Sequence, residues 1–206
     1  KEDRLAFSCL CELDKQGNIT EYKFAKTVIR SRVKGVYSEI NSLLAGSDDA
    51  ELKEKYAEVS GQLPIIKELA DILYKNKKNR GCPELETSES KLIINDEDIC
   101  VGVERRTRGR SEEIIEDFML VANECAARFG MDNNLPFVYR IHEEPSDEKL
   151  ESLREALVKL NVQYKLGEKA CPGDMSEILK AAKGTDIDII MNNIVLRSMS
   201  KARYST

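Results

Sequence analysis

The sequence has few of the side chains from which metal sites and hydrolytic triads are built. It contains one histidine, His142, and none of its six cysteines belongs to a CxxC pair, so the usual zinc-binding spacings are missing. Walker, GxGxxG, HExxH and GxSxG motifs are also absent. His142 would be the single base for a serine or cysteine nucleophile, and a buried or hydrogen-bonded structural role suits it better. The residues alone therefore indicate no familiar catalytic motif.

Long hydrophobic runs are missing as well. The longest uncharged stretches, such as residues 189–196, are far shorter than the roughly 20 residues of a membrane-spanning helix. The first four residues, KEDR, are charged and do not resemble a signal peptide. We therefore expect no membrane partner, a cytoplasmic location, and reduced cysteines that pack as small hydrophobic side chains. Because the first residue is not methionine, we also expect the chain to be a fragment.

What is present is the composition of a soluble globular protein. The chain has 206 residues, of which 41% are hydrophobic and 33% charged, and its net charge is −5. This composition excludes collagen and disordered tails, and the length suffices to bury a core without disulfides or metals. No repeat or low-complexity linker interrupts the chain. We expect one compact unit of α/β (α+β) class, in which helices flank an antiparallel or mixed sheet.

Local patterns place the strands and helices. A turn at 15–18 between β-prone runs at 4–14 and 19–32 predicts an antiparallel hairpin, and runs at 91–95 and 99–104 predict a second hairpin around a polar acidic turn. A further strand is expected at 137–141. Helices are expected at 37–44, from Asp49 to about residue 74 with a break near Gly61 and Pro64, and over 186–202.

Capping residues predict three more helices. Ser111 and Ser146 are expected to cap two of them, and Asp174 with Glu177 resembles a capping box that opens a third. The helix after Ser111 is apolar nearly all round, so we expect it to be central and buried. Just before it lie four arginines within six residues: Arg105, Arg106, Arg108 and Arg110. Such a run can bind the phosphates of a polyanion or can be an ordinary solvated loop.

Five segments, taken together, resemble a known family. They are RLAFS at 4–8, VIRS at 28–31 with VY at 36–37, IEDFMLVAN at 115–123, YRIHEEP at 139–145, and LRSM at 196–199 with Ala202 and Tyr204 behind it. In order and spacing they resemble the catalytic RNB domain of the ribonuclease R and ribonuclease II family of 3′-to-5′ exoribonucleases. The resemblance extends over essentially the whole chain and is greater to the ribonuclease R branch.

The resemblance implies an enzymatic activity, and it implies that several functional segments of such an enzyme lie outside residues 1–206. Such an enzyme degrades single-stranded RNA processively from its 3′ end to nucleoside 5′-monophosphates. Its Mg²⁺ is held by a cluster of four aspartates that precedes the region matched here, and an arginine motif follows that region. Cold-shock and S1 domains flank it. We therefore expect residues 1–206 to be the central part of an RNB domain, truncated at both ends, without catalytic or metal-binding residues of its own. The alternative is a non-catalytic RNA-binding module with a degenerate RNB core.

The resemblance also implies roles for three residues. Tyr37 and Glu116 match positions that contact ribose near the 3′ end, where a phenol and a carboxylate can each hydrogen-bond the 2′-OH that distinguishes RNA from DNA. The ordinary alternatives are a packing residue at a helix start and a structural carboxylate. Leu85 stands where family members carry an aromatic residue that stacks on bases, and leucine offers apolar contact without stacking.

Overall fold

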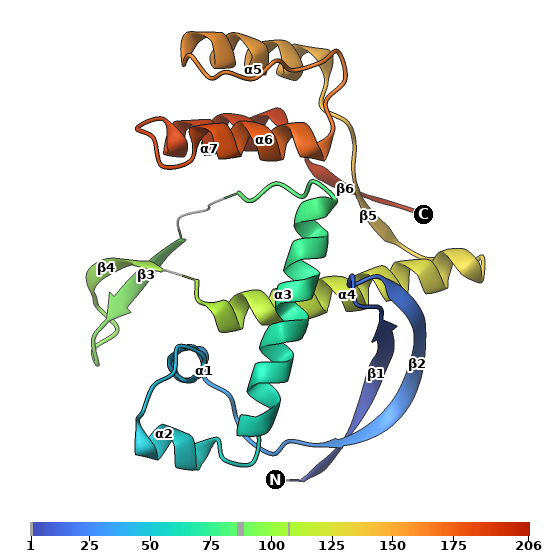
Figure 1. The fold of residues 1–206 in the computed structure, drawn as a ribbon, viewed down its shortest axis with the longest axis vertical. Coiled ribbons are helices and arrows are strands. Elements are labelled where there is room, and N and C mark those ends of the chain that lie inside the picture. Colours follow the sequence, from blue (N-terminus) through green and yellow to red (C-terminus); the bar gives the residue numbers. More distant parts are fainter. Residues whose placement is uncertain (1, 86–88, 107) are drawn as a thin grey trace. The chain divides into compact units, whose positions relative to one another are not determined.

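The computed structural model describes residues 2–85, 89–106 and 108–206 (Figure 1). The elements are β1 (Asp3–Leu13), β2 (Ile19–Arg30), α1 (Tyr37–Leu44), α2 (Ala50–Lys55), a 3-10 turn (Ser60–Gln62), α3 (Leu63–Asn79), β3 (Glu89–Ile94), β4 (Cys100–Arg106), α4 (Arg110–Asp132), β5 (Tyr139–His142), α5 (Asp147–Lys159), α6 (Pro172–Ala182), α7 (Asp188–Ser198) and β6 (Ala202–Ser205). They form two compact units. Unit 1 comprises residues 1–76 and 106–135, and unit 2 comprises residues 77–105 and 136–206.

The mixed α/β class is as the sequence predicts, but the strands are arranged as small pairs. In the described part of the chain they form three two-stranded sheets, β1 with β2, β3 with β4, and β5 with β6. Helices supply most of the rest of both units (Figure 1). The expectation that residues 1–206 form a central piece of one domain stays a prediction.

The first hairpin confirms the sequence prediction. β1 and β2 pair antiparallel from Asp3 opposite Arg30 onward. At the turn, the Asp14 carboxylate accepts hydrogen bonds from the backbone N–H of Gln16 and from both the backbone and side chain of Asn18, at 2.8–2.9 Å. Gly17 has a φ of 81°, a left-handed conformation that glycine adopts without a steric cost. Local chemistry therefore sets the register of this pair.

The hairpin packs on α4 through aromatic rings and thiols. The Phe24 and Phe129 rings meet edge to face with centroids 5.6 Å apart. The Cys125 side chain is fully buried, and its Sγ lies 3.7 Å from Sγ of Cys11. Burial, followed by hydrogen bonds to Cys11 and Cys9, raises the pKa of the Cys125 thiol to about 12. All six cysteines lie in the described residues and are free thiols, so these three pack as small hydrophobic groups.

Helix α4 differs from the prediction at its start. Its N-cap is Gly109, whose N–H donates to the Glu112 carboxylate at 3.1 Å, so the expectation that Ser111 caps the helix is wrong. The structural reason is that Asn41 lies against Gly109: a Cβ at this position would overlap the Asn41 carboxamide. Ser111 is instead in the first turn of α4 and is buried.

Burial of α4 all round is also wrong. One side of α4 packs against α1, β1 and β2 in unit 1. Elsewhere on the helix, Ile115, Met119 and Leu120 are 44%, 59% and 39% exposed. The apolar pattern correctly marks a helix, but the described residues of unit 1 cover only part of its circumference.

The predicted break between α2 and α3 is confirmed. Asp49 caps α2 by accepting hydrogen bonds from the N–H groups of Glu51 and Leu52. A 3-10 turn follows, and α3 begins at Leu63. Pro64 therefore lies in the first turn of α3, where its missing N–H has no helical acceptor to lose.

The core of unit 2 lies among α5, α6 and α7. Four side chains at its centre are fully buried: Leu153, Ile178, Met191 and Val195. The predicted capping box at Asp174 and Glu177 is wrong, because α6 begins at Pro172 with Cys171 as its N-cap. Asp174 is instead the third residue of α6. Its carboxylate accepts hydrogen bonds from the N–H of the N-cap residue Cys171 at 2.7 Å and from the Tyr164 hydroxyl at 2.6 Å.

The end of the chain is also different from the prediction. Helix α7 ends at Ser198, and Ala202–Ser205 forms β6, although the sequence predicts a helix through residue 202. β6 pairs antiparallel with β5, so that His142 is opposite Ala202 and Tyr139 is opposite Ser205. Nδ1 of His142 lies 3.2 Å from the Ser200 carbonyl oxygen, which agrees with a hydrogen-bonded structural histidine.

Candidate functional site

The candidate site in unit 1 lies where α1 meets the first turns of α4 (Figure 1). Tyr37 is the first residue of α1, and its carbonyl oxygen accepts a hydrogen bond from the buried Ser111 hydroxyl at 3.0 Å. The Tyr37 side chain itself is exposed. The structure therefore fixes the backbone at Tyr37 and leaves its phenol accessible to a ligand.

Asn41 joins the same two helices. Its Oδ1 accepts the Ser111 N–H at 2.8 Å, and its Nδ2 donates to Oε2 of Glu112 at 3.0 Å. Partial burial acts to raise the pKa of Glu112, but hydrogen bonds from Asn41, Ser111 and the Gly109 N–H outweigh it and hold that pKa below its ordinary value. Glu112 is thus a carboxylate at neutral pH, and its hydrogen bond with Asn41 helps to hold α1 against α4.

Glu116 lies five residues beyond Ser111, which is about 7.5 Å along the axis of α4. Its side chain is half exposed, and one carboxylate oxygen forms an ion pair with Nη1 of Arg108 at 3.6 Å. Tyr37 and Glu116 are therefore exposed on two helices in contact within one unit. Their shared contact with a single ribose stays a prediction.

The arginine run divides into residues with different surroundings. Arg108 is half exposed and pairs with Glu116. Arg110 is largely buried between α3 and α4, with Nη2 at 2.5 Å from Asp71 and Nη1 at 2.9 Å from Glu113. Burial acts to lower the pKa of Arg110, but its hydrogen bonds to the two carboxylates raise it. The guanidinium also lies 5.9 Å from the centroid of the Tyr74 ring.

These contacts give Arg110 a structural role that the sequence does not show, because Asp71 lies 39 positions away. The side chains of Arg105 and Arg106, at the end of β4, lie outside the described residues. Phosphate binding by the run stays a prediction.

Leu85 lies in unit 2 and is half-buried, packed against the core of α5, α6 and α7. This packing accounts for a leucine at the position without invoking a nucleic-acid base. Apolar contact with a base stays a prediction for this residue.

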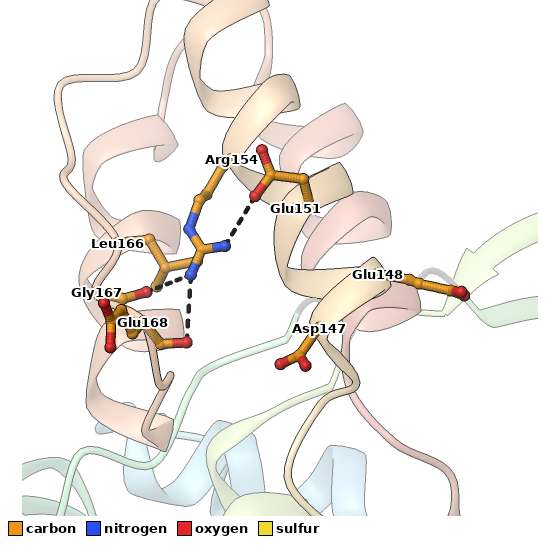
Figure 2. Close-up of a pocket in the computed structure, with 7 residues that line it drawn as sticks. All are labelled: Asp147, Glu148, Glu151, Arg154, Leu166, Gly167 and Glu168. Atoms are coloured by element: carbon orange, nitrogen blue, oxygen red, sulfur yellow. Dashed lines mark hydrogen bonds and ion pairs between the residues drawn. The ribbon is translucent and has the colours of Figure 1, made fainter.

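A pocket in unit 2 was not indicated by the sequence (Figure 2). Arg154 of α5 donates from Nη1 to Glu151 at 2.9 Å. From Nη2 it donates to the carbonyl oxygens of Gly167 and Glu168 at 2.5 and 3.3 Å, and these bonds connect the loop between α5 and α6 to α5. The pocket is open, with a volume of about 560 Å³, and four carboxylates line it beside this single arginine. Such a surface repels a polyanion, so it is unsuited to RNA phosphates.

Residues 2–85, 89–106 and 108–206 contain no group of three or more His, Cys, Asp or Glu side chains placed to hold a metal ion. Within the same ranges, no helix has the length and apolar character needed to cross a bilayer. What the candidate site offers chemically is the phenol of Tyr37 and the carboxylate of Glu116.

Comparison with known proteins gives one consistent result. The family described as RNB domain matches residues 1–206. Ribonuclease R 1 of Lactococcus lactis is 34% identical over 98% of this chain and 25% of its own length. The structure of Mycoplasma genitalium RNase R in complex with ribose methylated single-stranded RNA matches with a TM-score of 0.88 and 25% identity over 99% of this chain and 32% of that one. A yeast pseudonuclease, Ssd1, shares the fold at 14% identity and a TM-score of 0.68, over 98% of this chain and 24% of that one. The chain spans about a quarter of the length of the curated relative.

Proposed function

This chain belongs to the RNB domain family, and on that premise we propose that it is part of a processive 3′-to-5′ exoribonuclease that hydrolyses RNA to nucleoside 5′-monophosphates. The observation that carries the proposal is the match of nearly the whole chain to an RNase R described with single-stranded RNA bound. In this protein, residues 1–206 supply part of the wall of the RNA channel and the contacts to ribose.

The ribose contacts come from the exposed side chains of Tyr37 and Glu116. A carboxylate can only accept hydrogen bonds, so Glu116 accepts a hydrogen bond from the 2′-OH. The Tyr37 hydroxyl can donate to the 2′-oxygen, so the two residues satisfy both capacities of one hydroxyl. Since DNA lacks that hydroxyl, the arrangement favours RNA.

We place the metal chemistry outside this chain. In the proposed enzyme, Mg²⁺ would activate water and stabilise the leaving oxygen, and its ligands would be aspartates in the longer protein. The binding partner of the proposed enzyme is the 3′ end of single-stranded RNA. We expect the longer protein to be cytoplasmic and to carry flanking cold-shock and S1 domains that assist in binding RNA. Accordingly, residues 1–206 alone should release no nucleotides from single-stranded RNA with Mg²⁺ present. Magnesium-dependent release of monophosphates by this purified chain would refute that placement.

The ribose contact is tested in the longer protein with Tyr37→Phe and Glu116→Gln. Cleavage rates are measured on an RNA and on the same RNA with one 2′-deoxyribose near its 3′ end. Tyr37→Phe removes the donor to the 2′-oxygen, and Glu116→Gln keeps an acceptor but removes its charge, so each change should cost about 1 kcal/mol and lower the RNA-to-deoxy rate ratio about threefold to tenfold. Glu113→Gln, also half exposed on α4, is the matched control and should leave the ratio intact. Unchanged ratios in both test variants would contradict the proposal.

A non-catalytic RNA-binding module is the second candidate. The observation in its favour is that the same fold occurs in a protein described as a pseudonuclease. The longer protein decides between the two functions: a module would bind single-stranded RNA without releasing monophosphates at any Mg²⁺ concentration. The sequence preceding residue 1 gives a second criterion, since a cluster of four aspartates there favours the enzyme.

A further inference from the structure

Helix α1, which carries Tyr37, is attached to unit 1 by polar contacts. All eight of its residues are described, and none of them is buried. Its N-cap, Val36, provides no side-chain hydrogen bond within the described structure. A helix this short is marginal on its own and usually depends on burying an apolar face. Because the apolar side chains of α1 are at most half-buried, the position of Tyr37 also depends on specific polar anchors.

One anchor is Tyr56, directly after α2. Its side chain is 1% exposed, so it lies within the protein and away from any ligand in solvent. The Tyr56 hydroxyl accepts the N–H of Val36 at 3.1 Å, and it donates to Oε2 of Glu39 at 2.5 Å. Val36 immediately precedes Tyr37, and Glu39 lies in the first turn of α1. A single buried oxygen thus connects the entry to α1 with its first turn.

Glu39 keeps this anchor charged. Oε2 of Glu39 also accepts from Nζ of Lys55 at 2.6 Å. The hydrogen bond from Lys55, followed by that from Tyr56, holds the pKa of Glu39 below its ordinary value. The carboxylate therefore stays ionised at neutral pH and remains the acceptor for the one proton that Tyr56 can donate. The Lys34 carbonyl oxygen, at 3.5 Å, is the weaker alternative acceptor.

The second anchor acts on the other side of Tyr37. The Ser111 hydroxyl binds the Tyr37 carbonyl oxygen, and Asn41 holds Ser111 and Glu112 together. The backbone is therefore held by hydrogen bonds at the N–H of the preceding residue, Val36, and at the carbonyl oxygen of Tyr37 itself. From this geometry we infer that Tyr56 is a positioning residue for ribose recognition: its hydroxyl fixes the N–H of Val36, one residue before Tyr37, and through Glu39 the first turn of α1, and thereby orients the Tyr37 phenol toward the RNA.

This inference rests on the proposed function, and Tyr56→Phe in the longer protein tests it. The variant keeps the buried ring and removes only the hydroxyl. We expect the RNA-to-deoxy rate ratio to fall about threefold to tenfold, the loss that corresponds to one ordinary hydrogen bond. In a Tyr37→Phe background, Tyr56→Phe should add almost nothing, because it acts through Tyr37. A merely structural role would not produce this dependence.

Tyr22→Phe is the matched control. It also removes a tyrosine hydroxyl that donates to a carboxylate in unit 1, that of Asp132 at 3.0 Å at the far end of α4. It should leave the ratio unchanged. If Tyr56→Phe fails to fold, Glu39→Ala replaces it, since Glu39 is less buried than Tyr56 and this change removes the acceptor of the Tyr56 hydroxyl, which should lower the ratio in the same way.

The outcomes separate the two proposals. If Tyr37→Phe leaves the ratio unchanged, the proposed ribose contact is wrong. If Tyr37→Phe lowers the ratio while Tyr56→Phe and Glu39→Ala behave like Tyr22→Phe, the contact stands and the positioning role of Tyr56 is refuted. An equal loss from Tyr56→Phe with and without the Tyr37 hydroxyl would likewise refute it.

Discussion

Changing Arg110 to serine should destabilise the protein and leave its affinity for RNA intact. The Arg110 side chain is 23% exposed and holds two carboxylates, those of Asp71 and Glu113, that are themselves about half exposed. Because water screens such pairs, each contributes about 0.5 kcal/mol. Packing of the guanidinium near the Tyr74 ring adds about 0.5–1 kcal/mol. The free energy of unfolding should therefore fall by about 1.5–2 kcal/mol.

Thermal unfolding followed by circular dichroism measures this loss. For a chain of this length, it corresponds to a fall in Tm of about 3–8 °C. Arg108→Ser is the matched control, because Arg108 is half exposed and forms an ion pair with Glu116 at the longer distance of 3.6 Å. It should cost less than about 0.5 kcal/mol. RNA affinity of the longer protein is measured against salt concentration in parallel.

Two results would refute this interpretation of Arg110. The first is equal destabilisation by Arg108→Ser and Arg110→Ser, which would mean that the contacts of Arg110 with Asp71 and Glu113 add no stability. The second is weaker RNA binding with a shallower salt dependence in Arg110→Ser, since that is the behaviour of a phosphate contact.

Two further predictions concern unit 2. Gly81→Ala and Gly184→Ala both place a Cβ at a φ of +76°, but only at Gly81 would that atom clash, at 2.8 Å from Cα of Gly173. Urea unfolding should show a loss of about 1 kcal/mol for Gly184→Ala and clearly more for Gly81→Ala; equal losses would mean that the close approach is unimportant. Tyr164→Phe tests a pH dependence of stability. The hydrogen bond to Asp174 and, to a smaller extent, burial raise the pKa of Tyr164 to about 12. The same hydrogen bond is the main cause that lowers the pKa of Asp174 below its ordinary value. The stability advantage of the wild type over Tyr164→Phe should be full between about pH 4 and 10, decline in acid as Asp174 is protonated, and decline between about pH 10 and 12 as Tyr164 ionises. An advantage that is constant with pH in urea titrations would contradict this.

Sequence reasoning succeeded where local chemistry decides the structure. The turn at 15–18 contains its own left-handed glycine and follows Asp14, whose carboxylate accepts hydrogen bonds from Gln16 and Asn18, so the first hairpin was predictable. The break between α2 and α3 follows from Pro64 in the same way.

It failed where distant residues decide. Residues 202–205 lie just beyond a helix, yet they form a strand because β5, some 60 positions earlier, offers them a pairing edge. The start of α4 is at Gly109 because Asn41, far earlier in the chain, occupies the space that a side chain would need. Neither partner is visible in the local pattern.

The residues of the candidate site were likewise predictable only in part. Tyr37 and Glu116 were found through resemblance to a family, and their exposure on contacting helices is compatible with the role that it implies. Tyr56 is not among the residues that the sequence singled out. Its hydroxyl acts on Val36, 20 positions earlier, and no spacing rule connects two such residues.

The buried thiol of Cys125 makes the attachment of the hairpin to α4 measurable by chemical labelling. Alkylating reagents attack the thiolate, and a thiol whose pKa is raised to about 12 is almost never in that form near neutral pH. Cys125 should therefore react only during the rare openings in which β1 leaves α4, at a rate set by the opening equilibrium. Cys82, Cys100 and Cys171 are exposed and give the unprotected rate in the same sample. The order in which the cysteines are alkylated thus ranks the local stability of unit 1 without a mutation or a denaturant.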